Sequence, residues 1–325
     1  MKQNPKIDKD IRDLKNSLQS DFGRNNYKNL HRRATELYNK AKAIGYLKGE
    51  YGSLNILGNA SFIICDYQKA QSYFLRSIEV AEKMKDLKDL AFGLNNIGII
   101  FFRLKNFKRA LEYYNKALNI KLRFNNKASI STTYNNIGLI YHNLKEYDKA
   151  LEYFQRSLKI DKEINNSHAI CRELSNMGLV WKFKNDLDKS LKFFKDSYEE
   201  SRKISYKKGM ATALSNISNH YLTAGEHDKA LEKALEGEEI ALKINSNNHL
   251  FHFYMTIAGA FEKKKNYKKA LKYFKKYTEL KDSILSEETH NKIMEMQIKY
   301  ESEKNERELE LYQSKTKELE LLNAK

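Results

Sequence analysis

Hydrophobic and small residues recur along this chain with a period of 40 residues. The period is visible when the sequence is divided into blocks that begin at residues 11, 51, 91, 131, 171, 211 and 251. Position 8 of the blocks is glycine in four consecutive cases, namely Gly58, Gly98, Gly138 and Gly178. Position 20 is alanine in five blocks, namely Ala70, Ala110, Ala150, Ala230 and Ala270. Self-similarity of this kind is the signature of a repeat architecture.

Each block predicts two amphipathic helices joined by a short polar link. Positions 4, 7, 8 and 11 share one face of the first helix, and positions 17, 20, 24 and 27 share one face of the second. The small residues at positions 8 and 20 let the two helices approach closely, and aromatic residues at position 24 fill the space around that contact. A single pair cannot bury both of its apolar faces, so neighbouring pairs must stack. We therefore expect an all-α, right-handed superhelical solenoid of about seven helix pairs.

The pattern divides the chain into three parts. Residues 1–50 hold a degenerate first repeat, which we expect to cap the array because terminal repeats are atypical. Residues 51–282 hold six regular repeats. Residues 283–325 contain no glycine or proline and predict a capping helix followed by a charged helical extension. An interrupted heptad frame in this extension predicts a marginal coiled coil, through which two copies of the chain would pair as a homodimer.

The sequence resembles the tetratricopeptide repeat family over nearly the whole of residues 11–282. The segments NIGLIY (136–141) and DKALEYF (148–154) carry the small and aromatic positions of that family at their proper spacing. The chain departs from the family in its period, which is 40 rather than 34 residues, and in lacking the closing proline near position 32. We expect asparagines such as Asn125 and Asn165 to end the second helices instead, in the left-handed conformation that asparagine tolerates.

The resemblance also implies a function. Repeats of this 40-residue type occur in peptide receptors, in polarity adaptors and in the sensor regions of bacterial histidine kinases and transcriptional regulators. We therefore expect a protein- or peptide-binding scaffold that forms the sensory part of a bacterial signalling protein. The alternative is a peptide-regulated receptor that acts on a response regulator, although such receptors carry an N-terminal helical bundle for which the residues before Tyr51 are too few.

Composition and motifs bear on location and chemistry. No stretch is long and apolar enough to span a membrane, and the N-terminus lacks the apolar core of a signal peptide. We expect a cytoplasmic protein; a periplasmic location would require a removed signal peptide, and a membrane contact would require a further C-terminal part. Motifs of metalloproteases, thiol redox proteins and serine hydrolases are missing, and the histidines lack metal-ligand spacing. We expect no enzyme activity, no cofactor and no metal, and Cys65 and Cys171 lie too far apart in the register for a disulfide.

The candidate binding residues belong to the first helix of each block. Stacked pairs of this kind curve so that the first helices line the concave face, where positions 2, 5, 6, 9, 12 and 13 point inward. Asparagine fills position 5 or 6 in several consecutive blocks, and its amide can pair with an extended peptide backbone as both donor and acceptor. The predicted peptide-binding residues are Asn55, Asn95, Asn96, Phe102, Arg103, Asn135, Asn136, His142, Arg172, Asn176, Lys182 and Asn216.

The asparagines allow two other interpretations. Asparagine at position 6 is common in the family and can bond only to its own scaffold, and the sequence alone does not decide between scaffold and peptide. A known use of such grooves clamps the C-terminal carboxylates of other proteins. Asn59 and Asn96 match that clamp, but Asn55, Thr132 and Asn136 stand where it needs cations, so the clamp is not expected.

The net charge of +17 favours an acidic partner. The segment KKKNYKKALKYFKK (263–276) contains eight lysines and no acidic residue, which raises nucleic acid or an anionic surface as a further alternative. In the repeat register, however, Tyr267 and Phe274 occupy core positions, so that the lysines fall mostly on a solvated face. We therefore expect a protein or peptide partner rather than nucleic acid.

Overall fold

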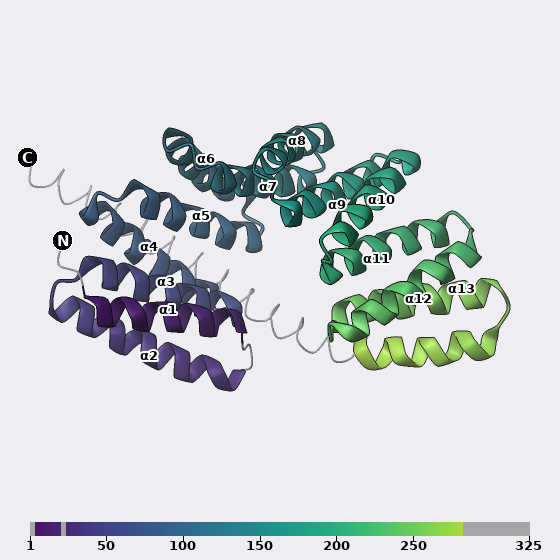
Figure 1. Cartoon of the computed structure of the whole chain (residues 1–325), viewed down its shortest axis with the longest axis horizontal. Coiled ribbons are helices and arrows are strands. Elements are labelled where there is room, and N and C mark those ends of the chain that lie inside the picture. Colours follow the sequence, from purple (N-terminus) through teal and green to yellow (C-terminus); the bar gives the residue numbers. More distant parts are fainter. Residues whose placement is uncertain (1–3, 21–23, 282–325) are drawn as a thin grey trace, which may run out of the picture. The chain divides into compact units, whose positions relative to one another are not determined.

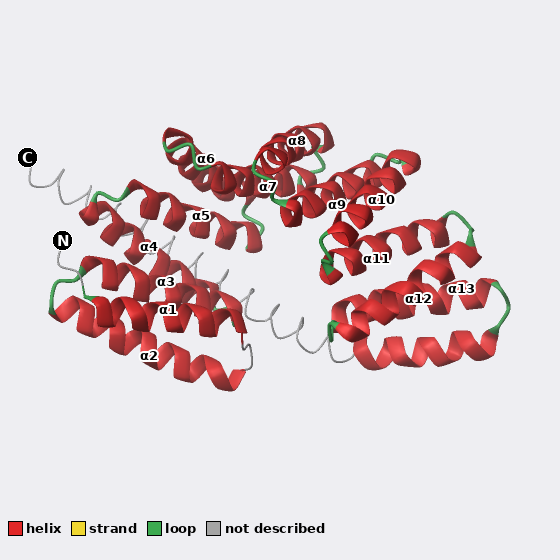
Figure 2. Ribbon diagram, in the orientation of Figure 1, coloured by secondary structure: helices red, strands yellow, loops and turns green. Residues whose placement is uncertain are grey.

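The computed structural model describes residues 4–20 and 24–281, and every regular element in these residues is an α-helix (Figure 1, Figure 2). The helices are α1 (Pro5–Ser20), α2 (Arg24–Ala43), α3 (Leu47–Ile63), α4 (Tyr67–Met84), α5 (Leu87–Arg103), α6 (Phe107–Arg123), α7 (Lys127–Asn143), α8 (Tyr147–Glu163), α9 (Ser167–Phe183), α10 (Leu187–Lys203), α11 (Lys207–Thr223), α12 (His227–Lys243) and α13 (Asn247–Lys263). A further helical segment covers residues 267–281. The predicted all-α class of stacked helix pairs is confirmed for these residues.

The 40-residue period follows from the lengths of the helices and links. From α5 to α13 every helix has 17 residues, and links of three residues separate them. The middle residue of each link adopts a left-handed conformation, as with φ of 49° at Asn125, 53° at Asn165 and +79° at Gly225. The predicted role of the asparagines is therefore confirmed. Lysine occupies the same place at Lys105 and Lys145, which the sequence pattern did not predict.

Glycine at position 8 makes room for the aromatic ring at position 24. A Cβ atom built on Gly138 would lie 2.7 Å from a ring carbon of Phe154, closer than real contacts allow. The same arrangement recurs at Gly98 with Tyr114, where the distance is again 2.7 Å. Phe154 is 1% exposed and Ala150 is fully buried. The small and aromatic columns of the sequence therefore form one packing unit within the four hairpins that have glycine at position 8.

Neighbouring hairpins stack as the repeat predicts. Phe154 and Leu151 of α8 share a buried cluster with Met177 and Val180 of α9, the first helix of the following repeat. A second helix is thus covered on one side by its own partner and on the other side by the next repeat. This two-sided cover explains why one hairpin alone leaves apolar surface exposed.

The chain divides into two compact units, with the division after Ile120 in α6. In the first unit, the apolar residues Ile7, Ile11 and Leu14 of α1 are buried together with Ile56 of α3. The predicted boundaries at residues 50 and 282 stay predictions, and residues 283–325, with the expected coiled coil and homodimer contact, lie outside the described residues.

One expectation about the last described helix is wrong. Tyr267 and Phe274 were assigned to the core by their register, but they are 65% and 53% exposed, and Leu271 is 57% exposed. The reason is that a second helix buries such residues against the first helix of the following repeat, as Phe154 does against α9. No following first helix lies among the described residues, so this face of residues 267–281 is only partly covered.

Candidate functional site

Two neighbouring hollows lie along the first helices of the second unit. The Arg172 hollow, between α9 and α11, has a volume of about 330 Å³, and the His249 hollow, between α11 and α13, has a volume of about 400 Å³. The two share the side chains of Thr212 and Asn216. The Arg172 hollow is also lined by His168, Arg172, Ser175, Asn176, Leu179, Tyr206 and Lys208, and the His249 hollow by Ser215, Asn219, Asn248, His249, His252, Met255 and Thr256.

The asparagines of α7 and α9 contact one another rather than standing separately. Asn135 is 4% exposed, and its Oδ1 accepts a 2.9 Å hydrogen bond from the Nδ2 of Asn176. The Nδ2 of Asn135 lies 3.4 Å from the Oδ1 of Asn136. When the Asn135 amide is rotated, its nitrogen lies 3.2 Å from both carboxylate oxygens of Glu173. Asn135, at position 5, is therefore buried between repeats, whereas Asn176, at position 6, lines the Arg172 hollow.

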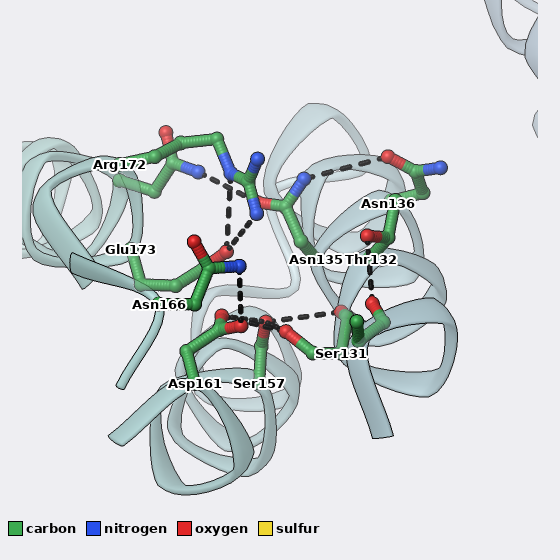
Figure 3. A network of polar contacts seen from close by, with 11 residues as sticks. Ser131, Thr132, Asn135, Asn136, Ser157, Asp161, Asn166, Arg172 and Glu173 are labelled. Atoms are coloured by element: carbon green, nitrogen blue, oxygen red, sulfur yellow. Dashed lines mark hydrogen bonds and ion pairs between the residues drawn. The ribbon is translucent and has the colours of Figure 1, made fainter. Parts of the chain in front are cut away.

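A fully buried carboxylate, Glu173, supports this corner of the Arg172 hollow (Figure 3). Its Oε1 accepts hydrogen bonds from Arg172, at 3.2 Å from Nε and 3.0 Å from Nη2. Burial raises the pKa of Glu173 to about 7; the Arg172 guanidinium opposes this shift, and the nearby Asp161 carboxyl adds to it. The Arg172 side chain itself is 44% exposed. A half-exposed guanidinium is thus held in place by an acid that solvent does not reach.

Asp161 of α8 is the second fully buried acid at this junction. Its Oδ2 accepts a 2.6 Å hydrogen bond from the hydroxyl of Ser131, and its Oδ1 accepts one of 3.3 Å from the amide of Asn166 (Figure 3). The hydroxyl of Ser157 also donates to Oδ2, at 3.4 Å. Neutral donors therefore surround Asp161, and none of these three groups carries a compensating charge.

The remaining predicted residues of the second unit line or flank the same helices. Lys182 donates a 2.8 Å hydrogen bond to Oδ1 of Asn219, and burial lowers the pKa of this lysine. His142 packs edge-on against Phe183, with ring centroids 5.1 Å apart, and burial lowers the pKa of His142. Asn216 lies where the two hollows meet. The structure thus brings Arg172, Asn176 and Asn216 to one hollow.

The predicted asparagines of the first unit are buried, whereas Phe102 is half-buried and Arg103 is exposed. Asn55 is 3% exposed and donates a 2.9 Å hydrogen bond to the carbonyl of Tyr51 within its own helix. Asn95 and Asn96 are 8% and 7% exposed. The guanidinium of Arg103 lies 5.8 Å from the centroid of the Phe62 ring. Phe102 packs against Phe107, with ring centroids 5.9 Å apart. These side chains contact the scaffold, and their assignment to a peptide stays a prediction.

Sequence reasoning missed the two buried acids. Glu173 occupies position 3 of its repeat, where the other regular repeats have Ser53, Gly93, Thr133, Ala213 and Phe253, none of them charged. Asp161 occupies position 31, where the others have Ala81, Lys121, Ser201, Ala241 and Lys281, none of them acidic. An acidic residue in a column that holds no other acid in the regular repeats is the signal that could have identified them. Thr212 was also missed, because a lone threonine carries no such signal.

No helix within residues 4–20 and 24–281 is long and apolar enough to cross a membrane. Both cysteines are free thiols, with Cys171 buried and Cys65 half-buried. Burial raises the pKa of the Cys171 thiol.

Comparison with solved structures identifies the fold. A Rap protein complexed with Competence and Sporulation Factor is 14% identical over 88% of this chain and 90% of its own, with a TM-score of 0.64. Aspartyl phosphate phosphatase F from Bacillus subtilis is 17% identical over 78% of this chain and 75% of its own, with a TM-score of 0.60. The quorum sensor NprR from B. thuringiensis is 13% identical over 84% of this chain and 87% of its own, with a TM-score of 0.57. At these identities the likeness concerns the fold alone.

Comparison of the sequence with protein families and with curated proteins gives complementary results. No relative of the chain is found among curated protein sequences. Family models of the tetratricopeptide repeat match residues 51–123, 131–163 and 251–283. These segments coincide with the repeats that the 40-residue period defines, and their helix pairs stack as the fold requires. The chain therefore contains tetratricopeptide repeats in these three segments.

Proposed function

We propose that this protein is a non-enzymatic scaffold that binds an extended peptide segment along the first helices of its second unit. The observation that carries the proposal is the pair of hollows that meet at Thr212 and Asn216. An extended peptide presents donors and acceptors at regular intervals, and the amides and hydroxyls that line both hollows can pair with either kind of group.

Asn216 is the asparagine best suited to this role. Among the described residues, its side chain makes no hydrogen bond, whereas Asn135 and Asn176 bond to each other. An amide without a protein partner keeps its donors and its acceptor for a ligand, and binding then replaces water rather than an internal bond. Asn216 therefore anchors the peptide backbone in this proposal, and the Asn135–Asn176 pair supports the wall beside it.

We further infer that peptide binding serves signalling, as the sensory or interaction region of a bacterial regulator. Two proteins of similar fold support this inference. One is a Rap protein in complex with Competence and Sporulation Factor, and the other is the quorum sensor NprR. A cytoplasmic location is consistent with this role and belongs to the proposal.

The test uses the full chain, immobilised, with a synthetic library of acetylated and amidated heptapeptides. The wild type should retain a defined subset of sequences. Asn216→Ala should weaken binding of that subset by about threefold to tenfold, which corresponds to the loss of one or two neutral hydrogen bonds. The control is Asn115→Ala, which removes an exposed asparagine from α6. Equal retention by Asn216→Ala and the wild type would place the binding surface elsewhere.

A further inference from the structure

The guanidinium of Arg172 is held in place by Glu173, but this contact engages only part of its N–H donors. A guanidinium carries five N–H donors, and the contact with Glu173 engages one from Nε and one from Nη2. Because the Arg172 side chain is 44% exposed and lines the hollow, the remaining donors are within reach of a bound group. Arginine in a fixed orientation is well suited to binding a planar carboxylate through two parallel hydrogen bonds.

The surroundings of Arg172 also favour an anion. Lys208 and His168 line the same hollow, together with the neutral donors Asn176 and Asn216. The side chains lining it, all within the described chain, include no aspartate or glutamate, because Glu173 is buried behind the surface. The charge that faces a ligand here is therefore positive.

We propose that the Arg172 hollow is a subsite for one carboxylate of the bound peptide, and that Glu173 takes up a proton from solvent when that carboxylate engages Arg172. The inference rests on the proposed peptide-binding function and adds the chemical class of one recognised group. The arrangement differs from the family's carboxylate clamp in two ways: Asn55, Thr132 and Asn136 stand where the clamp needs cations, and the buried Glu173 already holds the Arg172 guanidinium.

Glu173 takes up a proton because it competes with the ligand carboxylate for the Arg172 guanidinium. A ligand carboxylate and Glu173 would share one guanidinium, and Glu173 is fully buried, so an ionised Glu173 would lose part of its contact with Arg172, its close positive partner among the described residues. A buried anion without a full partner is costly, and protonation removes that cost. Because burial already raises the pKa of Glu173 to about 7 in the free protein, a small further rise in this pKa suffices to protonate Glu173 at neutral pH.

The groups around Glu173 can accommodate both protonation states. Asp161 of α8 is the neighbouring acid and favours protonation, Arg172 of α9 opposes it, and Lys208 of α11 lines the hollow beyond Arg172. From α7, the amide of Asn135 can donate to an ionised Glu173 or, turned over, accept from a protonated one, since the relevant atoms lie 3.2 Å apart. The amide rotation gives the proton a hydrogen-bond acceptor without any backbone movement.

The experiment uses three fluorescent heptapeptide libraries on the full chain, with randomised flanks free of acidic residues. The first has a central glutamate, the second a central glutamine, and both are acetylated and amidated. The third has a central glutamine and a free C-terminal carboxylate. At pH 6.5 we expect the glutamate library to bind about tenfold more tightly than the glutamine library, as for a charge-assisted hydrogen-bonded pair. A preference for the third library would instead identify a C-terminal carboxylate as the recognised group.

The pH dependence has a defined sign. Since binding takes up a proton, affinity for the carboxylate library should fall as pH rises from 6.5 to 8.5. Glu173→Gln mimics the protonated acid, so it should bind that library at least threefold more tightly than the wild type at pH 8.5 and should lose the pH dependence. Arg172→Gln should bind the glutamate and glutamine libraries equally.

The control is Arg156→Gln, which removes an exposed arginine that pairs with Glu152 on α8, away from the hollow, and should change neither preference. If Arg172→Gln lowers the melting temperature below the assay temperature, the neutral pair Arg172→Gln/Glu173→Gln takes its place.

Each outcome bears on a different claim. Failure of all three libraries to bind would overturn the proposed function and this inference together. Equal binding of all three by the wild type would leave peptide binding intact and overturn the carboxylate subsite. A preference that survives Arg172→Gln would overturn the location, and a pH dependence that survives Glu173→Gln would overturn the proton uptake.

Discussion

At the scale of single residues, the packing of four hairpins depends on one glycine at position 8 and one aromatic ring at position 24. Gly138 lies against Phe154 so closely that even a methyl group would meet ring carbons at 2.7 Å, and the ring is 1% exposed and cannot swing into solvent. By contrast, Gly259 of α13 has room for a methyl group, since an added Cβ would make an ordinary van der Waals contact at 3.4 Å with a carbon of Leu222. Glycine at these two positions therefore has opposite consequences for stability.

Gly138→Ala and Gly259→Ala make a matched pair that tests this difference. Alanine gains about 1 kcal/mol over glycine inside a helix, but at Gly138 overpacking costs about 1–3 kcal/mol and should outweigh that gain. We expect Gly138→Ala to lower the free energy of unfolding and Gly259→Ala to raise it by about 0.5–1 kcal/mol. Chemical denaturation measures both, and stabilisation by both variants would show that the ring has room to move.

At the scale of elements, the repeats differ in the buried polar residues at the junction between a second helix and the following first helix. At this junction, position 31 of one repeat faces position 3 of the next repeat. At one junction Lys121 donates a 2.7 Å hydrogen bond to Thr133, and at the next Asp161 lies near Glu173. Burial lowers the pKa of Lys121 to about 8 and raises that of Glu173 to about 7. Charged groups at these junctions therefore cost stability at neutral pH.

The junction between α8 and α9 makes folding stability depend on pH. The folded pKa of Glu173 is about 7 against an ordinary value of 4.5, so folded protein holds the proton more tightly between these values. The favourable contribution is complete below about pH 4.5 and is lost as pH rises through 7. We expect the melting temperature of Glu173→Gln to rise relative to the wild type between pH 4.5 and 8. Glu152→Gln, an exposed glutamate of α8, controls for loss of a glutamate, and a Glu173→Gln difference constant with pH would contradict the expectation.

At the scale of the whole molecule, the net charge of +17 provides attraction without specificity. Such a field draws in any polyanion, whereas in the proposed function the two hollows would recognise a peptide mostly through the amides and hydroxyls that line them. The two kinds of binding respond differently to salt, because each phosphate contact releases counterions and each neutral hydrogen bond does not.

Salt therefore separates charge-driven binding from binding in the hollows. Between 50 and 200 mM salt, affinity for mixed-sequence duplex DNA should fall by more than about a hundredfold. Over the same range, affinity for the central-glutamine peptides should change by less than about threefold. Fluorescence anisotropy measures both on the full chain. An equally steep fall for the peptides would mean that the general field, not the hollows, holds them.

Much of the fold was determined by the sequence itself. The 40-residue period, the paired helices and the asparagines that end second helices at Asn125 and Asn165 were all predictable, because helix periodicity and left-handed links depend on neighbours within one hairpin. The stacking of hairpins followed as well, since each hairpin has apolar faces on both sides. The presence of asparagines along the first helices was equally plain, but not which of them were buried.

Only the tertiary structure decided the features that depend on contacts between repeats. Asn135 is buried and bonds to Asn176, although the pattern placed both facing inward to the same groove. Arg172 is tied to Glu173 by a contact that no spacing rule indicates, since the two are sequence neighbours and their pairing depends on the burial of Glu173 at the junction with α8. Phe274 is exposed for the converse reason: its register belongs to the core, but no following helix among the described residues covers it.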